Sequence, residues 1–261
     1  MENYLVLETY DNAFEAELAK ALLEENGIAV ELKNSLINSI YPTFAGDMYR
    51  LELCVPVDSS EAAREILDSY TDGFTTHKIL QQENALLEGH FQLTSGRHSS
   101  RYIEKIRILQ NPEQASQLCK MMADRLSDLE FDAVVGPAYG GIALAFETAR
   151  LISSQFIFTQ RKDEKMTVRN GFDLSGIKSV VIIEDIVTTG GSVKEVIDCF
   201  REMNISVTAV AAIVDRSGGK VDFRCEFIPL LTLDIPSWEA DECPLCKNEM
   251  PIIKPGSSDK K

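Results

Sequence analysis

Apolar runs of strand length alternate with stretches in which apolar residues recur every three or four positions. From Pro112 onward this pattern predicts strands at residues 132–135, 156–159, 180–183 and 206–214. It also predicts a helix that begins at Pro112, after the capping residue Asn111, and helices at residues 142–151 and 193–200. Strands that alternate with helices in this way are typical of a doubly wound, mostly parallel α/β sheet.

The first quarter of the chain has a different order. Residues 4–10, 28–32 and 50–55 are predicted strands; one helix, capped by Asp11 or Asn12, follows the first strand, and another follows the third, from Asp58. This order predicts a small α+β module of ferredoxin-like type over residues 1–72. Residues 71–76, which contain Asp72-Gly73, are expected to form a linker, followed by a helix over residues 77–87 that opens a second domain at residues 77–261.

The strand at residues 180–183 carries the most specific pattern in the chain. It ends in Glu184 and Asp185, crosses an apolar pair, and enters a Thr-Thr-Gly-Gly-Ser turn that opens a helix. A glycine turn at a helix N-terminus binds anions, because unpaired backbone N–H groups converge there. Carboxylates beside such a site would repel a phosphate, so we expect them to accept hydrogen bonds from hydroxyl groups of the same ligand. A phosphorylated sugar meets both requirements.

Three further segments have the character of binding loops. Residues 136–141 form a glycine-rich turn after a strand, where backbone can approach an anion closely. Residues 160–171 hold four basic residues without helical periodicity, as expected of an unstructured lid. A Thr-Ser-Gly-Arg turn at residues 94–97, and Arg216 after the last predicted strand, offer guanidinium groups suited to a planar carboxylated ligand.

Charge and composition restrict the classes of function. Of the 261 residues, 44% are hydrophobic, and the net charge is −15. Residues 1–75 hold 15 acidic and 4 basic residues, a net charge of −11, so the remainder is nearly balanced. This distribution argues against a nucleic-acid surface. Neither a bilayer-spanning apolar run nor a secretory signal is visible, so we expect no membrane partner and a cytoplasmic location.

The stretch at residues 180–192 resembles the phosphoribosyl pyrophosphate (PRPP) signature of type I phosphoribosyltransferases. The turn at residues 94–97 resembles the base-binding segment of the orotate phosphoribosyltransferases within that group. The first module is similar in pattern to small bacterial signal-transducing domains. The resemblance over residues 77–257 implies the type I fold, with a small hood, and transfer of the phosphoribosyl group from PRPP to orotate. The products would be orotidine 5′-monophosphate and pyrophosphate, in pyrimidine synthesis.

The same resemblance assigns roles to residues. The PRPP-binding residues are expected to be Arg161, Lys162, Lys165, Glu184, Asp185, Ile186, Val187, Thr188, Thr189, Gly190, Gly191 and Ser192. The pyrophosphate loop would be Pro137, Ala138, Tyr139, Gly140 and Gly141, with a cis peptide at Ala138-Tyr139. Orotate would contact Thr94, Ser95, Gly96, Arg97, Thr188 and Arg216. Lys165, Glu184 and Asp185 are the expected catalytic residues.

Cofactor and assembly follow from the resemblance as well. It implies Mg²⁺, and a homodimer with shared active sites in which Lys165 reaches the neighbouring subunit's site. This chain departs from the family at Gly140, where many members carry Lys, so backbone or another lysine is expected to supply a pyrophosphate contact. It also departs at Thr167, where many members carry His.

Two other functions remain open on the sequence. A purine or uracil salvage transferase would share the PRPP signature, and a non-catalytic PRPP-sensing regulator would bind PRPP without turnover. Near the C-terminus, Cys243 and Cys246 supply half of a tetrahedral zinc site, with neither a second pair nor a histidine nearby in sequence. Structural packing is favoured for this pair; a reversible disulfide and a zinc site between subunits are the alternatives.

Overall fold

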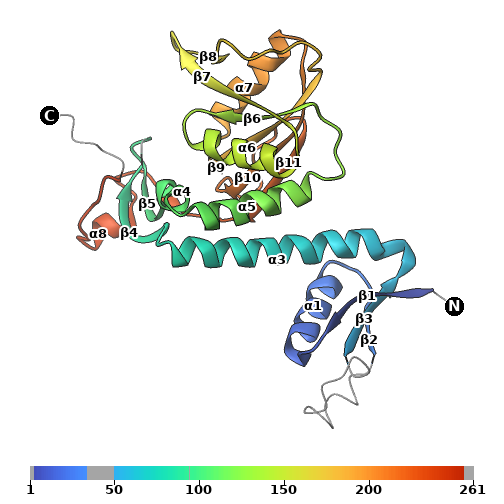
Figure 1. The fold of residues 1–261 in the computed structure, drawn as a ribbon. Coiled ribbons are helices and arrows are strands. Elements are labelled where there is room, and N and C mark those ends of the chain that lie inside the picture. Colours follow the sequence, from blue (N-terminus) through green and yellow to red (C-terminus); the bar gives the residue numbers. More distant parts are fainter. Residues whose placement is uncertain (1–2, 34–49, 94, 256–261) are drawn as a thin grey trace. The chain divides into compact units, whose positions relative to one another are not determined.

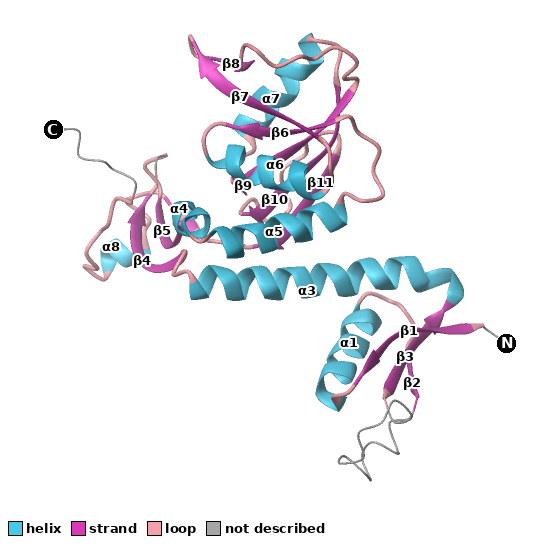
Figure 2. Cartoon of the chain, viewed as in Figure 1, coloured by secondary structure: helices cyan, strands magenta, loops and turns pink. Residues whose placement is uncertain are grey.

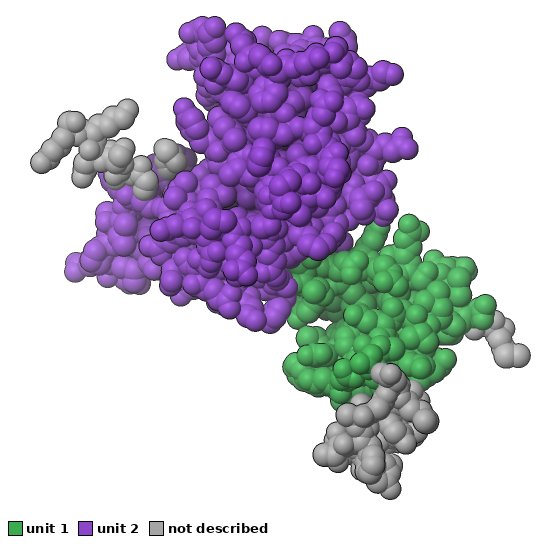
Figure 3. All heavy atoms as spheres, in the orientation of Figure 1, with its two compact units in different colours: residues 1–72 green, residues 73–261 purple. Residues whose placement is uncertain are grey.

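The computed structural model describes residues 3–33, 50–93 and 95–255 (Figure 1). The chain divides into two compact units, Met1–Asp72 and Gly73–Lys261 (Figure 3). Within the described residues, every helix is too short or too polar to cross a lipid bilayer.

The first unit is a small α+β module, as predicted. It contains β1 (Tyr4–Tyr10), α1 (Ala13–Glu25), β2 (Glu31–Lys33), β3 (Leu51–Pro56) and a short 3-10 turn, η2 (Val57–Ser59). The three strands form an antiparallel sheet in the order β1-β3-β2. Asn12 caps α1, because its side chain accepts a hydrogen bond from the backbone N–H of Phe14 at 2.8 Å. Leu23 of α1 is fully buried against Leu53 and Val55 of the sheet.

A single helix, α3 (Ser60–Gln82), runs through the segment predicted to be a linker. The turn expected at Asp72-Gly73 was therefore wrong, although the boundary between the two units lies within residues 71–76. Thr76, Ile79 and Leu80 are buried at i, i+3 and i+4 spacing, so burial of this face outweighs the weak turn preference of Asp72-Gly73. The predicted helix end at Leu87 was also wrong. The chain turns at Asn84, with φ +50°, and residues from Leu86 form a strand.

The second unit is built on a six-stranded sheet in the order β11-β10-β9-β6-β7-β8 (Figure 2). All neighbouring pairs are parallel except β7 and β8. The strands are β6 (Ala133–Pro137), β7 (Gln155–Lys162), β8 (Lys165–Val168), β9 (Ser179–Val187), β10 (Ser206–Asp215) and β11 (Glu226–Thr232). This arrangement confirms the predicted doubly wound, mostly parallel sheet.

Helices cover both faces of this sheet. On one face, α5 (Pro112–Arg125) and α6 (Gly140–Leu151) pack against side chains that include Val181 and Ile183 of β9. On the other, α7 (Gly191–Glu202) packs against Val180 and Ile182. Successive side chains of β9 thus enter opposite cores, which explains why the strand is apolar at every position from Val180 to Ile183.

The basic segment is a hairpin formed by the end of β7 and by β8, so the prediction of an unstructured loop at residues 160–171 was wrong for residues 160–168. Lys162 of β7 pairs with Lys165 of β8. Between them, Asp163 and Glu164 have φ +50° and +64°. Two consecutive left-handed residues form the tight turn that suits the twist of two antiparallel strands. Alternating apolar positions are too few here to reveal a strand in the sequence.

A smaller sheet forms the hood. It contains β4 (Leu86–Gln92), β5 (His98–Ile103) and β12 (Ser237–Trp238), in the antiparallel order β12-β5-β4. In the chain, β5 is followed by α4 (Lys105–Gln110). The C-terminal segment passes through α8 (Pro244–Lys247) and returns to β4. There the Ile253 N–H donates to the His90 carbonyl at 2.8 Å, and the Gln92 N–H donates to the Ile253 carbonyl at 2.9 Å.

The continuity of α3 is testable at Gly73. A Cβ added there would meet its nearest atoms, Leu230 O and Leu231 Cδ1, at 3.6 and 3.8 Å, which is ordinary contact. Gly73→Ala should therefore raise the free energy of unfolding by about 0.5–1 kcal/mol through helix propensity. Gly73→Pro should lower it by about 3 kcal/mol. Urea unfolding measures both values, and a flexible linker at residues 71–76 would leave both near zero.

Candidate active site

The turn after β9 forms an anion cradle whose shape requires glycine. Gly190 lies in the left-handed region, with φ +72°, directly before α7. A Cβ on Gly190 would lie 2.7 Å from Val221 Cγ1 and 2.9 Å from Phe223 Cε1. The turn can therefore close against residues 221–223 only without a side chain. Its backbone N–H groups are those of a helix N-terminus, which favours a bound phosphate.

The loop after β6 lies beside this cradle, because β6 and β9 are neighbours in the sheet. The peptide Ala138–Tyr139 is cis, which confirms the expectation from the resemblance. From β6 the chain enters α6 on one face of the sheet, whereas from β9 it enters α7 on the other. The two loops diverge at such a point and leave a crevice at the carboxyl ends of the strands.

A cavity of about 180 Å³ occupies this crevice. It brings together the predicted pyrophosphate loop, the two carboxylates, the phosphate turn and two residues of the basic hairpin, Arg161 and Met166. The lining residues are Lys105, Pro137, Ala138, Tyr139, Gly140, Arg161, Met166, Glu184, Asp185, Ile186, Val187, Thr188, Thr189, Gly190, Gly191, Ser192 and Val193. Gly141 lies just behind the loop, where a Cβ would come within 2.8 Å of the Ile183 carbonyl oxygen.

Lys105, Asp185 and Gly140 form one tightly fitted group. The Lys105 Nζ lies 2.8 Å from Asp185 Oδ2 and donates to Oδ1 at 3.2 Å. Asp185 is 2% exposed, and a Cβ on Gly140 would overlap its Oδ2 and lie 3.4 Å from the Lys105 Nζ. Gly140 therefore leaves the space that the Asp185 carboxylate occupies. Lys105 brings an ammonium group to the same cavity from the start of α4.

The two neighbouring carboxylates differ in their electrostatic surroundings. Burial, together with repulsion from Asp185, raises the pKa of Glu184 well above its usual range. Burial alone would lower the pKa of Lys105, but the Asp185 carboxylate outweighs it, and the pKa is raised. Lys105 thus compensates one of the two acidic groups. A cation or a group of hydroxyls in the cavity would compensate the other.

The basic hairpin contributes unequally to the cavity. Arg161 lines it and pairs with Glu195 of α7 at 2.7 Å. Lys165 does not line it; its Nζ lies 2.7 Å from Glu202 on the exposed side of the hairpin. Lys162 is exposed and lies outside the cavity lining as well. Thr167 donates a hydrogen bond to the Gln160 carbonyl at 3.2 Å, within the hairpin itself.

A second, larger cavity of about 670 Å³ adjoins the first, because Thr188 and Thr189 line both. Its other lining residues come from the hood, the end of β10 and the C-terminal segment. They are Gln92, Leu93, Ser95, Arg97, Tyr102, Arg216, Ile235, Ser237, Lys254 and Pro255. Gly96 belongs to the same turn, with φ +84°, and the predicted contact Thr94 lies outside the described residues.

The two arginines of this pocket are in different states. Arg97 donates to the Ser237 hydroxyl at 3.1 Å and to the Ser237 carbonyl at 2.6 Å, and it also pairs with Glu239. By contrast, the buried Nε of Arg216 has no hydrogen-bond partner among the described residues. Burial lowers the pKa of Arg216, with little nearby charge to offset this. A buried guanidinium N–H without a partner is costly unless a ligand accepts from it.

Sequence reasoning missed several of these residues. Tyr102 lies in β5 and Lys105 at the start of α4, in a segment without a recognised motif, and only the fold brings them to the two cavities. The signal for Lys105 was indirect: Gly140, in place of a lysine, implied only that backbone or another lysine would supply the contact. Cys243 and Cys246 lie at α8, outside the linings of both cavities.

Comparison with known proteins agrees with this geometry. Residues 106–243 match the family described as "Phosphoribosyl transferase domain", and residues 6–71 match one described as "Putative prokaryotic signal transducing protein". The fold and the paired cavities thus define the second unit as a phosphoribosyltransferase.

Relatives specify the class further. The orotate phosphoribosyltransferase of Caldicellulosiruptor bescii is 45% identical over 183 residues, which is 70% of this chain and 96% of the relative. That of Heliobacterium modesticaldum is 48% identical over 181 residues, 69% of this chain and 95% of the relative. The crystal structure of the Aeropyrum pernix enzyme, 26% identical, superposes with a TM-score of 0.52 over 60% of this chain and 92% of that one. The chain belongs to the orotate phosphoribosyltransferase family.

The fit of the phosphate turn against residues 221–223 is testable with two glycines of similar backbone conformation. Gly190→Ala and Gly176→Ala both place a side chain at positive φ, +72° and +86°, but only Gly176 has open space around it. Each change should cost about 1 kcal/mol for the left-handed conformation. The collision should cost Gly190→Ala at least about 1 kcal/mol more. Equal losses in urea unfolding would contradict the fit.

Proposed function

We propose that this protein transfers the 5-phosphoribosyl group of PRPP to orotate, giving orotidine 5′-monophosphate and pyrophosphate. The observation that carries the proposal is the buried, unpartnered Arg216 Nε in a pocket that shares Thr188 and Thr189 with the anion cradle. A carboxylated base in the larger pocket would satisfy Arg216 while facing a phosphorylated ribose in the smaller one. The family membership supports the same reaction.

The smaller cavity supplies the contacts for PRPP. The turn at residues 188–192 would bind the 5′-phosphate through its backbone N–H groups. Glu184 and Asp185 would accept hydrogen bonds from the ribose hydroxyls. The loop at residues 137–141 would hold pyrophosphate, assisted by Lys105, whose ammonium group takes the part that a lysine at Gly140 would otherwise play.

The donor atoms present also fit Mg²⁺. Carboxylate oxygens of Glu184 and Asp185 border the cavity, and Mg²⁺ is bound in proteins through one or two carboxylates together with waters and substrate phosphates. When bound, the ion would neutralise charge on the pyrophosphate. Because Lys105 already pairs with Asp185, Glu184 is the less compensated of the two carboxylates.

The chain's own residues account for the chemistry of transfer. Breaking the bond at the anomeric carbon builds positive charge on the ribose, which the carboxylates of Glu184 and Asp185 stabilise. Before this step the basic hairpin closes over the bound PRPP, excludes water and brings Lys162 to the pyrophosphate beside Arg161. Arg216, with Ser95, Gly96 and Arg97, holds orotate so that its ring nitrogen faces the ribose.

Lys165 is proposed to act from a second subunit. In one chain it lies outside the cavity, paired with Glu202 in an exposed ion pair, and such pairs are weak and screened by salt. The lysine can therefore leave Glu202 at little cost. A cytoplasmic homodimer with shared sites would let it reach the neighbour's pyrophosphate.

A panel of acceptors tests the proposed reaction. The full chain is incubated with PRPP, Mg²⁺ and one base at a time: orotate, uracil, adenine or hypoxanthine. We expect only orotate to be consumed, with one pyrophosphate released per nucleotide formed. Consumption of another base would indicate a salvage enzyme. PRPP binding without any turnover would indicate a regulator.

Arg216→Ala should raise the KM for orotate about 10- to 100-fold, because a charge-assisted hydrogen bond contributes about 1.5–3 kcal/mol. The KM for PRPP should change little, since Arg216 is outside the lining of the smaller cavity. Lys220→Ala, an exposed cation in the same connection, is the matched control. An unchanged orotate KM in the Arg216 variant would remove the assigned contact.

Lys165→Ala should lower kcat at least tenfold while the KM for PRPP stays within a few-fold, because the lysine acts on the leaving group after closure. Lys120→Ala, another exposed lysine in an ion pair, should leave both constants unchanged. Steady-state kinetics at saturating orotate distinguish the two variants. Wild-type turnover in the Lys165 variant would exclude this residue from the mechanism.

A further inference from the structure

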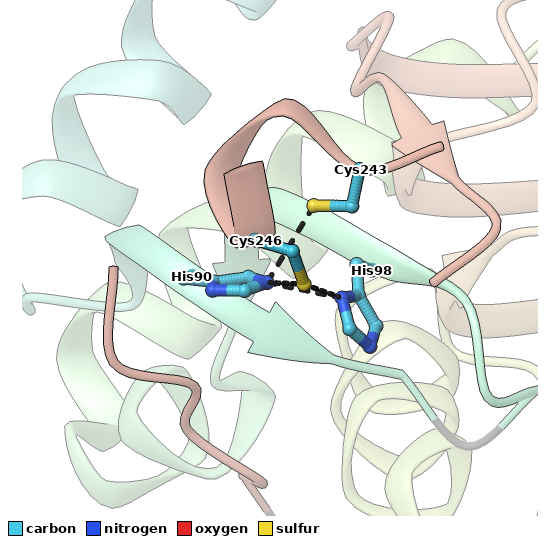
Figure 4. A group of neighbouring side chains, drawn as sticks. All are labelled: His90, His98, Cys243 and Cys246. Carbon is cyan, nitrogen blue, oxygen red and sulfur yellow. Dashed lines mark hydrogen bonds between the residues drawn. The ribbon is translucent and has the colours of Figure 1, made fainter. Parts of the chain in front are cut away.

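Four side chains outside both cavities form a compact group of nitrogen and sulfur atoms (Figure 4). His90 lies on β4 and His98 on β5. Cys243 directly precedes α8, and Cys246 lies within it. One ligand atom from each lies within 4.8 Å of all the others. The chain has only three histidines, and two of them meet the only Cys-x-x-Cys pair. We propose that these residues form a structural Zn²⁺ site.

The distances between the ligand atoms fit a tetrahedral ion. With Zn–S near 2.3 Å and Zn–N near 2.0–2.1 Å, tetrahedral angles place two nitrogens about 3.4 Å apart and a nitrogen and a sulfur about 3.6 Å apart. The His90 Nε2 lies 3.0 Å from the His98 Nδ1, 3.6 Å from the Cys243 Sγ and 3.7 Å from the Cys246 Sγ. The Cys246 Sγ lies 3.2 Å from the His98 Nδ1.

The orientation of His90 also suits a metal ligand. Its Nδ1 lies 2.8 Å from the Met250 carbonyl oxygen, which can only accept a hydrogen bond. The proton of a neutral ring therefore sits on Nδ1, and the lone pair of Nε2 points at the two sulfurs and the His98 Nδ1. Zinc-binding histidines are usually oriented in this way, by a hydrogen bond from their other ring nitrogen.

Charge and ligand type favour zinc over the alternatives. His90, His98 and Cys243 are buried, and all six cysteines are free thiols. When Zn²⁺ binds, the thiols of Cys243 and Cys246 each lose a proton to solvent. The ion, the two thiolates and the two neutral imidazoles then have a net charge of zero. Thiolate and imidazole ligands select zinc over Mg²⁺. Four protein ligands leave no open position, which is typical of a structural site.

The site would join two of the segments that line the larger pocket. His90 and His98 bracket residues 93–97, which carry Leu93, Ser95 and Arg97, while the cysteines begin the segment that ends at Lys254 and Pro255. Two backbone hydrogen bonds between β4 and Ile253, and that from the His90 ring to the Met250 carbonyl, hold the segment against β4. With zinc, the turn and the tail become one cross-linked unit. The sequence could not reveal this, because the histidines lie more than 140 positions from the cysteines.

Metal analysis of the full chain tests the proposal. Protein purified after growth with zinc should contain about one Zn²⁺ per chain by mass spectrometry of the metal. Protein from which zinc has been removed by a chelator should bind Co²⁺ and develop the visible absorption of a tetrahedral ion with thiolate ligands. The variants Cys246→Ser and His98→Ala should lose both signals. The matched controls Cys225→Ser and His77→Ala should keep both.

A second measurement covers variants that fail to fold. In the wild-type protein, two thiols should react with a thiol reagent only after a chelator has removed the zinc. The amount of zinc released should be one ion for every two thiols that become reactive. Less than about a tenth of an ion per chain, with no Co²⁺ spectrum, would overturn the site. A mass two hydrogens lower for the peptide that contains Cys243 and Cys246 would overturn it in favour of a disulfide.

Discussion

The ion pair between Lys105 and Asp185 is the contact on which the arrangement of the smaller cavity depends. Asp185 stands at the end of β9, and its carboxylate fills the space that a side chain at position 140 would need. The ion pair joins the start of α4 to the end of β9, and the loop after β6 packs against it at Gly140. The Asp185 carboxylate is almost wholly buried, whereas Lys105 is partly exposed. Breaking such a pair leaves an uncompensated buried charge. Loss of the pair should therefore disturb all three elements.

The parts of this site that are formed by contiguous residues could be predicted from the sequence. Residues 180–192 contain a strand, two carboxylates and a glycine turn in one stretch, so their local pattern specified the cradle. Lys105 could not be found in this way, because it meets Asp185 only through the crossing of α4 and β9. The same holds for the histidines at residues 90 and 98, which reach α8 only through the hood. Local pattern also failed where packing overrides it, as at Gly73, and where a hairpin is too short to show alternation, as after Gln160.

The second unit has two adjoining cavities that share two threonines, and in the proposed function donor and acceptor occupy one each. The parallel sheet positions the loops after β6 and β9, while the hood and the C-terminal segment line the larger cavity, which we propose to be the pocket for the base. The proposed zinc ion lies within the hood, so it would act on the acceptor pocket and leave the donor cradle intact. The first unit is a separate acidic module with its own core, and its family match marks it as distinct from the transferase.

The affinity of Gly140→Ala for PRPP tests the central claim most directly. The added methyl group should displace the Asp185 carboxylate from Lys105, and calorimetric titration with PRPP and Mg²⁺ should then give a dissociation constant at least tenfold higher than that of the wild-type protein. Gly176→Ala, at an open position far along the chain, should bind as the wild type does. An unchanged dissociation constant in the Gly140 variant, with the fold intact by circular dichroism, would contradict the account.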